Sequence, residues 1–89
     1  MRNADLVNNF INGACEGKGS NLKIEGNQLI NYTTCIAYRI GNTVYLNNTK
    51  YSSTTSVHQN RIRREAYNVV EMSEEELKRF VYESFSEVI

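Results

Sequence analysis

The segment TTCIAYRIGNTVYLNN, residues 33–48, decides the fold that the sequence predicts. Two apolar runs flank Gly41 and Asn42, and a Gly-Asn pair in this position is typical of the tight turn of a β-hairpin. With this turn, Tyr38 lies opposite Tyr45. Strand alternation then gives two faces, with Ile36, Tyr38, Ile40 and Tyr45 on one, and Cys35, Ala37, Val44 and Leu46 on the other. Because both faces are largely apolar, we expect the hairpin to be central in its sheet, or covered on one face by a partner chain.

The segment LKIEGNQLIN, residues 22–31, repeats this arrangement around a second Gly-Asn pair. The sequence therefore predicts two hairpins that form an antiparallel sheet over residues 22–48. Residues 15–20, CEGKGS, contain two glycines and are expected to form a flexible connector. A short helix is expected over residues 4–13, where apolar side chains recur at helical spacing. These side chains are Leu6, Val7, Phe10 and Ile11.

The first part of the remaining chain predicts a helix over residues 54–70. Thr54, Thr55 or Ser56 is expected to be its N-cap, because a short hydroxyl accepts a hydrogen bond from a free amide of the first turn. The side chains expected to point inward are Val57, Ile62, Ala66 and either Val69 or Val70.

Residues 73–89 predict the clearest amphipathic helix of the chain. Ser73 and Glu76 match the S-x-x-E capping box of a helix start. Apolar side chains follow at helical spacing, namely Leu77, Phe80, Val81, Phe85 and Val88. The order of elements indicates one α+β domain over residues 1–89, with a short N-terminal helix, an antiparallel sheet of two hairpins and two C-terminal helices.

Charge is unevenly distributed along the chain, although the formal net charge is zero. Residues 1–48 carry four basic and three acidic groups, and residues 49–64 carry four basic groups and no acid. Residues 65–89 carry two basic and seven acidic groups. A neutral total argues against a general nucleic-acid coat, so the layout matters more than the sum. The core of so short a chain is limited in size, and formation of a homodimer is one way of adding stability.

The sequence predicts neither an enzyme nor a metal or cofactor site. His58 is the only histidine, and no zinc-like spacing of cysteines and histidines occurs. The glutamates at positions 74–76 are typical of a first helical turn, where the helix dipole favours acids. No apolar run predicts a signal peptide or a membrane span. Cys15 and Cys35 form no disulfide framework, so we expect reduced thiols and a cytoplasmic location.

The segment YSSTTSVHQNRIRR, residues 51–64, is the main candidate for a contact site. A helix that begins inside it presents free amides and a partial positive charge to the hydroxyl-rich loop, where phosphate or carboxylate can bind. His58, Arg61 and Arg64 recur at a spacing of three, near one face of that helix. The simpler alternative is that the hydroxyls only cap the helix and the arginines are solvated or paired, as Arg61 can pair with Glu65. The candidate partner- or anion-binding residues are Tyr51, Ser52, Thr54, Thr55, Ser56, His58, Gln59, Arg61 and Arg64.

The acidic last helix also has two interpretations. Its glutamates either keep a small protein soluble, or imitate phosphate groups and occupy a basic groove on a nucleic-acid enzyme. The candidate acidic surface consists of Glu74, Glu75, Glu83 and Glu87.

Residues 29–63 resemble a small domain that recurs in bacteriophage and mobile-element proteins. The shared pattern is a tyrosine-threonine approach to a short Ile-Ala strand, then a turn, then Y-S-x-T-T-S-x-H-Q. The resemblance implies a phage or prophage origin and a modular unit of hairpin plus helix, and it carries over no catalytic residue. Cys35 stands where that pattern more often has a small residue or a proline. The matching residues are Tyr32, Thr33, Ile36, Ala37, Tyr51, Ser52, Thr54, Thr55, Ser56, His58 and Gln59.

Three functions follow as hypotheses. The first is a non-catalytic, phage-encoded inhibitor that binds and occludes a host anti-phage defence protein in the cytoplasm of an infected bacterium. Anti-CRISPR proteins act in this way, so a CRISPR effector is one candidate partner. The second is a small dimeric DNA-binding regulator, because amide and arginine side chains pair with base edges. Its DNA-contacting residues would be Gln59, Asn60, Arg61, Arg63 and Arg64. The third is a sponge that sequesters a nucleotide immune signal at the junction of loop and helix in residues 52–64.

Overall fold

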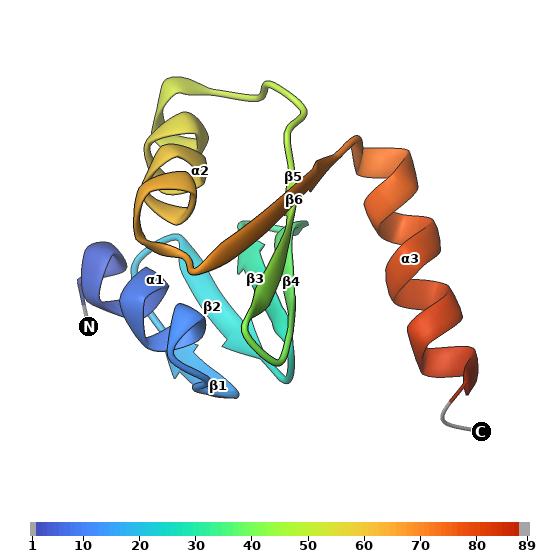
Figure 1. The fold of residues 1–89 in the computed structure, drawn as a ribbon. Coiled ribbons are helices and arrows are strands. Elements are labelled where there is room, and N and C mark those ends of the chain that lie inside the picture. The colour runs from blue at the N-terminus through green and yellow to red at the C-terminus, as the bar shows by residue number, and fades with distance from the viewer. Residues whose placement is uncertain (1, 88–89) are drawn as a thin grey trace.

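A computed structural model describes residues 2–87 of the chain and the side chains of residues 2–84 (Figure 1). Within these residues the fold is α+β, with three helices and one six-stranded mixed sheet. The helices are α1 (Asn3–Ile11), α2 (Ser53–Glu65) and α3 (Glu74–Glu87). The strands are β1 (Glu16–Lys18), β2 (Leu22–Glu25), β3 (Gln28–Asn31), β4 (Thr34–Ile40), β5 (Thr43–Asn47) and β6 (Asn68–Met72). The predicted N-terminal helix and both predicted hairpins are present.

The strands lie in the sheet in the order in which they occur along the chain. β1 to β5 form an antiparallel meander, and β6 then pairs parallel with β5. A parallel pair needs a crossover connection, and α2 provides it across one face of the sheet (Figure 1). The prediction of an antiparallel sheet of two hairpins is therefore incomplete. The predicted connector at residues 15–20 contains β1, and the end of the predicted helix at residues 54–70 contributes to β6.

α2 begins earlier than predicted and presents a different face to the core. Its N-cap is Ser52, whose side chain accepts a hydrogen bond from the amide of Thr55, so the predicted cap at Thr54, Thr55 or Ser56 is wrong. Val57, which was expected to point inward, is 58% exposed. Three polar side chains share the inward face with one apolar residue, which is why apolar spacing alone gave the wrong face. The buried residues of α2 are Thr55, His58, Gln59 and Ile62.

The helix also ends earlier than predicted. α2 stops at Glu65, and Ala66 has an extended backbone. Val69 then pairs with Val44 of β5, and the residues on either side continue the parallel ladder. β-branched side chains fit a pleated sheet well, and the unpaired edge of β5 supplies hydrogen-bond partners for this segment. The contact with a distant strand therefore overrides the helical continuation that local spacing predicts.

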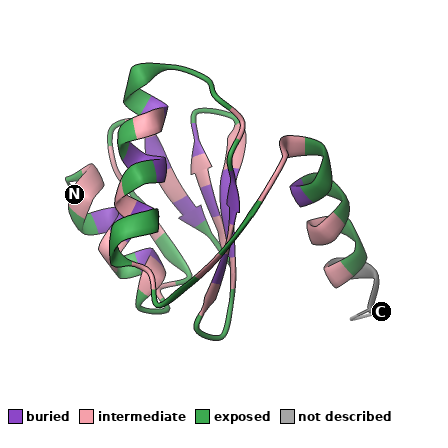
Figure 2. Cartoon of the chain, turned by 45° about the horizontal axis from the view of Figure 1, so that its top comes forward, coloured by how far each residue is buried: buried purple, intermediate pink, exposed green. Residues whose placement is uncertain are grey.

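The main core lies between the sheet and the layer formed by α1 and α2. These two helices pack against each other and cover the same face of the sheet (Figure 1). Figure 2 shows buried residues gathered along the strands and on the inner sides of both helices. Burial of each large apolar side chain stabilises the fold by about 1.5–3 kcal/mol. The core residues are Leu6, Val7, Phe10, Leu22, Ile24, Leu29, Ile36, Ala37, Val44, Leu46 and Ile62.

A β-bulge in β4 changes which side chains enter this core. Cys35 pairs with Ile30 of β3 and Ala37 pairs with Leu29, so Ile36 is an extra residue between the two pairs. Ile36 therefore enters the main core beside Ala37. Cys35 instead lines a cavity on the α3 side of the sheet. The predicted faces are wrong for Cys35 and Ile36, because strict alternation does not allow for an inserted residue.

α3 covers the opposite face of the sheet over β4 and β5. Tyr38 pairs with Tyr45 as predicted. The ring centroid of Phe80 lies 4.2 Å from that of Tyr45 and 6.0 Å from that of Tyr38. The hairpin is central in its sheet, as predicted, because β4 also pairs with β3 and β5 also pairs with β6. Helices of one chain cover both of its faces. The capping box is also confirmed, because Ser73 and Glu76 each donate a backbone hydrogen bond to the other's side chain, at 3.1 and 3.2 Å. Two residues of the predicted apolar stripe lie outside the described side chains, Phe85 and Val88.

Candidate functional site

The hydroxyl groups at the start of α2 attach the helix to the sheet. Ser52 Oγ accepts a hydrogen bond from the Thr55 amide at 3.3 Å and lies 3.2 Å from Thr55 Oγ1. Thr55 Oγ1 donates to Asn31 Oδ1 of β3 at 2.6 Å, and both of these residues are buried. The cap of α2 and its connection to β3 therefore use the same two hydroxyls. Thr55 is not accessible to a partner, and its amide, one of those that an anion at this helix start would need, is already occupied.

The buried amide of Gln59 forms the second connection between α2 and the sheet. Its Nε2 donates to the carbonyl oxygens of Asn47 at 2.8 Å and Thr49 at 3.0 Å. Asn47 Nδ2 in turn donates to the hydroxyl of Tyr51 at 2.9 Å. Both hydrogens of the Gln59 amide are thus engaged, and only 3% of the residue is exposed. Gln59 therefore has no donor left for a base edge.

His58 lies on the inner side of α2 and is only 5% exposed. Its Nε2 makes no hydrogen bond with any described residue. Burial, followed by the positive charge of Arg61, lowers the pKa of His58 below its usual value of 6.5. Within residues 2–87, no group of three histidine, cysteine or acidic side chains could hold a metal ion. His58 is therefore a packed, neutral side chain in this fold and lies away from the contact surface of α2.

The outward side of α2 carries the part of the predicted site that a partner can reach. Thr54, Val57 and Arg64 are exposed and Arg61 is half-buried. Their spacing of three, four and three residues places them along one side of the helix. We call these four residues the outer α2 surface. The structure thus divides the predicted segment 51–64 between an inner set that holds the fold and an outer set that faces solvent.

Ion pairs at the end of α2 differ from the predicted ones. Glu65 pairs with Arg64 at 3.2 Å, and the predicted pair with Arg61 is absent. Arg63 pairs with Glu71 of β6 at 2.9 Å. These exposed pairs contribute little to stability. Arg61 makes no ion pair or side-chain hydrogen bond with another residue in the described part of the chain, so its charge is available to a partner.

The acidic surface of α3 lies on the other side of the sheet from α2 (Figure 1). Glu75 and Glu83 are exposed, whereas Glu74 is half-buried and pairs with Lys78 at 3.4 Å. Tyr82 is 74% exposed on the same helix. The side chain of Glu87 lies outside the described part. The two candidate surfaces therefore do not form one site, and one flat partner surface cannot contact both.

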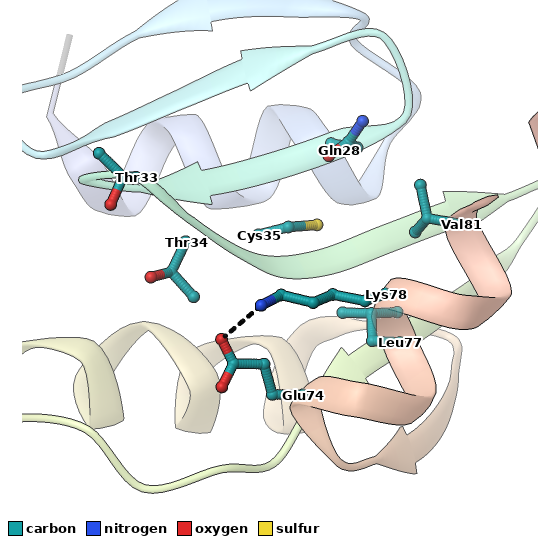
Figure 3. A pocket seen from close by; sticks show the side chains of 8 residues that line it. All are labelled: Gln28, Thr33, Thr34, Cys35, Glu74, Leu77, Lys78 and Val81. Atoms are coloured by element: carbon teal, nitrogen blue, oxygen red, sulfur yellow. Dashed lines mark ion pairs between the residues drawn. The ribbon is translucent and has the colours of Figure 1, made fainter.

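A cavity of about 320 Å³ lies between α3 and the first residues of β4 (Figure 3). Leu77 and Val81 form its apolar wall, and the Glu74–Lys78 ion pair lies at its rim. Burial raises the pKa of the Cys35 thiol, which also lines the cavity, to about 11. Sequence reasoning missed this cavity because the bulge that turns Cys35 toward α3 leaves no local signal.

The predicted nucleotide site at residues 52–64 contributes to none of four cavities that lie on the described chain. The four cavities, of about 190–320 Å³, lie elsewhere, and none is lined by a residue of that segment.

None of the described helices is both long and apolar enough to cross a membrane. Comparison with protein-family models, curated protein sequences and solved structures found no match to this chain.

Proposed function

We propose that this protein is a non-catalytic inhibitor that binds a host anti-phage defence protein and occludes its working surface. The observation that carries the proposal is the outer α2 surface. There Val57, 58% exposed, lies in one row with Arg61 and Arg64. An apolar side chain beside arginines is typical of a protein contact, because arginine is enriched among the residues that dominate interface energies.

The rigidity of α2 supports this proposal. Its inner residues Thr55 and Gln59 bind β3 and the end of β5 through short hydrogen bonds. The outer residues are therefore held in place before a partner arrives. A preorganised surface loses less conformational entropy on binding, and so retains more of its contact energy as affinity.

The chemistry of the described residues favours a protein partner over the two alternatives. Of the five residues predicted to contact DNA, Gln59 and Arg63 already have partners within the fold. A nucleotide sponge would need a cavity at residues 52–64, and none of the four cavities touches that segment. The choice of a host defence protein, of which a CRISPR effector is one example, rests on the bacteriophage origin that the sequence pattern of residues 29–63 leads us to expect.

A plaque assay tests the proposal. The protein is produced in bacterial strains that each carry one defined defence system, and plaques of a sensitive phage are counted. We expect the wild-type protein to restore plaques on at least one defended strain, and Val57→Asp combined with Arg61→Glu to abolish this effect. The matched control, Tyr82→Asp combined with Arg79→Glu on α3, should retain it. Circular dichroism establishes that both variants fold.

Binding to the purified defence protein then gives the magnitude. The outer α2 variant should weaken the dissociation constant by about 30- to 700-fold, the equivalent of about 2–4 kcal/mol lost at the centre of an interface. If no defended strain is rescued by the wild-type protein, the proposal fails. If only the α3 variant loses rescue, the inhibitor function stands and the contact surface is the acidic one. DNA titration at low salt adds a third outcome, because tight binding that the outer α2 variant abolishes would favour the regulator.

A further inference from the structure

The outer edge of β6 is the longer of the two free edges of the sheet. β1 and β6 are the first and last strands of the sheet, so each has one side without a neighbouring strand among the described residues (Figure 1). β1 has three residues, of which Glu16 and Lys18 are charged and exposed. Edge strands that are short and charged resist pairing with another chain. β6 has five residues, Asn68–Met72, and contains no proline, lysine or β-bulge that would block such pairing.

The hydrogen bonds of β6 show which of its backbone groups face the open side. The carbonyl oxygen of Met72 accepts a hydrogen bond at 2.8 Å from the amide of Asn48, the residue that follows β5. Successive residues of a strand direct their backbone groups to opposite sides, so Met72 and Val70 face β5, whereas Val69 and Glu71 face outward. No described residue forms a hydrogen bond with the outward N–H and C=O groups of Val69 and Glu71. These groups are therefore open to a further strand.

Apolar side chains lie beside this open edge on the α3 side of the sheet. Val70 pairs with Tyr45 of β5 and is 42% exposed. Met72 is on the same face because it lies two residues further along the strand. With Phe80, it lines a hollow of about 230 Å³ between β6 and α3. The edge thus combines free backbone groups with apolar side chains that the helices of the same chain leave partly uncovered.

We infer that β6 pairs antiparallel with β6 of a second copy of the chain and forms a symmetric dimer with one continuous sheet. With the twofold axis at Val70, Val69 of each copy faces Glu71 of the other, and each of these two pairs exchanges both of its N–H···O bonds. Val70 then lies opposite Val70 of the second copy, at the closer spacing of an antiparallel pair and within reach of Met72. The four side chains form one apolar cluster across the axis.

Charge and closure favour a second copy over an unrelated strand. No like charges lie opposite each other in this register, because Glu71 faces Val69 and its carboxylate already pairs with Arg63 at 2.9 Å. A twofold interface uses the same patch on both copies and closes on itself. Both free edges of the dimer's sheet would be β1, which is short and charged, so the assembly stops at two copies. An interface of one strand and a few side chains lies near the lower limit of about 1,200 Å² for stable complexes, so the dissociation constant should be in about the micromolar range.

Light scattering after size-exclusion chromatography tests the inference with the full chain alone. At about 100 μM the mass should be twice that of one chain, and it should fall toward the mass of one chain on dilution below the dissociation constant. Hydrogen exchange followed by nuclear magnetic resonance locates the interface. In the dimer, the outward amides of Val69 and Glu71 should be about as protected as the Val70 amide, which β5 protects already.

Two variants disrupt this edge in different ways, and each has a matched control. Glu71→Pro removes an outward N–H and leaves the ladder with β5 intact, whereas Glu71→Ala removes the same side chain and keeps that N–H. Val70→Lys places two positive charges opposite each other, whereas Val57→Lys adds the same charge at an exposed valine of α2. Both edge variants should raise the dissociation constant by at least about tenfold, and both controls should keep the wild-type value. Circular dichroism establishes that each variant folds.

The results separate this inference from the proposed function, because no defence protein takes part in these measurements. A wild-type monomer at about 100 μM would overturn the inference, and so would a dimer that both edge variants leave intact. Dissociation by Val57→Lys would place the dimer contact on the outer α2 surface and would also overturn it. If an edge variant does not fold, the wild-type exchange data decide: outward amides of Val69 and Glu71 that exchange freely in the dimer would refute the pairing.

Discussion

Replacing Gln59 by methionine tests whether segment 51–64 serves the fold before it serves any partner. The substitution keeps the length of the side chain and removes both hydrogen-bond donors. The carbonyl oxygens of Asn47 and Thr49, now 2.8 and 3.0 Å from Nε2, would then lose their donor. Each hydrogen bond contributes about 0.5–1.5 kcal/mol net, and a stranded buried acceptor costs more. We therefore expect the free energy of unfolding to fall by about 2–3 kcal/mol, a large share of the stability of a small domain.

Urea unfolding followed by circular dichroism measures this loss. With a slope of about 1.3 kcal/mol/M for a chain of this size, the midpoint should fall by about 1.5–2.5 M. The matched control is Asn60→Met, the next residue along the same helix, which is exposed and should change stability by less than about 0.5 kcal/mol. If Gln59→Met is as stable as that control, the amide is not needed for folding. Gln59 would then return as a candidate contact residue, and the division of α2 into inner and outer sets would be refuted.

Four further predictions concern groups on both faces of the sheet. Because the pKa of His58 is lowered in the fold, the unfolded chain binds more protons than the folded one at acidic pH. The free energy of unfolding should therefore decrease as the pH falls below about 6.5. Urea midpoints measured between about pH 5 and 8 check this, and constant midpoints would contradict it. Arg61→Gln should raise the pKa of His58 in a proton NMR titration. Phe80→Ala removes the contact of the Phe80 ring with Tyr38 and Tyr45. The free energy of unfolding should fall by about 2–3 kcal/mol, less than for a fully buried phenylalanine. A loss below about 0.5 kcal/mol in urea unfolding would show that α3 packs on the sheet without this ring. Burial raises the pKa of the half-buried Cys35 to about 11. At pH 8 a disulfide reagent should therefore label exposed Cys15 at once and Cys35 far more slowly until denaturant is added, and equally fast labelling of both thiols would contradict this prediction.

Local signals in the sequence were sufficient for the elements whose ends they mark. The Gly-Asn pairs placed both hairpins, and Gly41 has the positive φ that such a turn requires. The register of Tyr38 with Tyr45 follows from that turn alone. The capping box at Ser73 and Glu76 likewise located the start of α3. In these cases the determining interactions join residues a few positions apart, so no knowledge of the rest of the chain is needed.

The candidate site was predicted only in part. Arg61 and Arg64 were identified from charge and spacing, whereas Val57, the apolar member of the outer α2 surface, was expected to point inward. Their separation from Thr55 and Gln59 was not predicted, because these two polar side chains turn inward to hydrogen-bond partners in the sheet and its connecting loop. The inward position of His58 was not predicted either. The open edge of β6 was also missed, since the helix was expected to continue to residue 70.

The sequence by itself determined the two Gly-Asn turns, the capping box of α3 and the apolar stripes of α1 and α3, and with them an α+β domain whose central hairpin needs cover on both faces. The tertiary structure decided which way each polar residue of α2 points, and it made a strand of Asn68–Met72 where helical spacing had suggested a helix. It also placed the basic and acidic surfaces on opposite sides of the sheet. The physical reason is the same throughout. Each choice depends on a hydrogen-bond or packing partner that lies far along the chain, and only folding brings the two together.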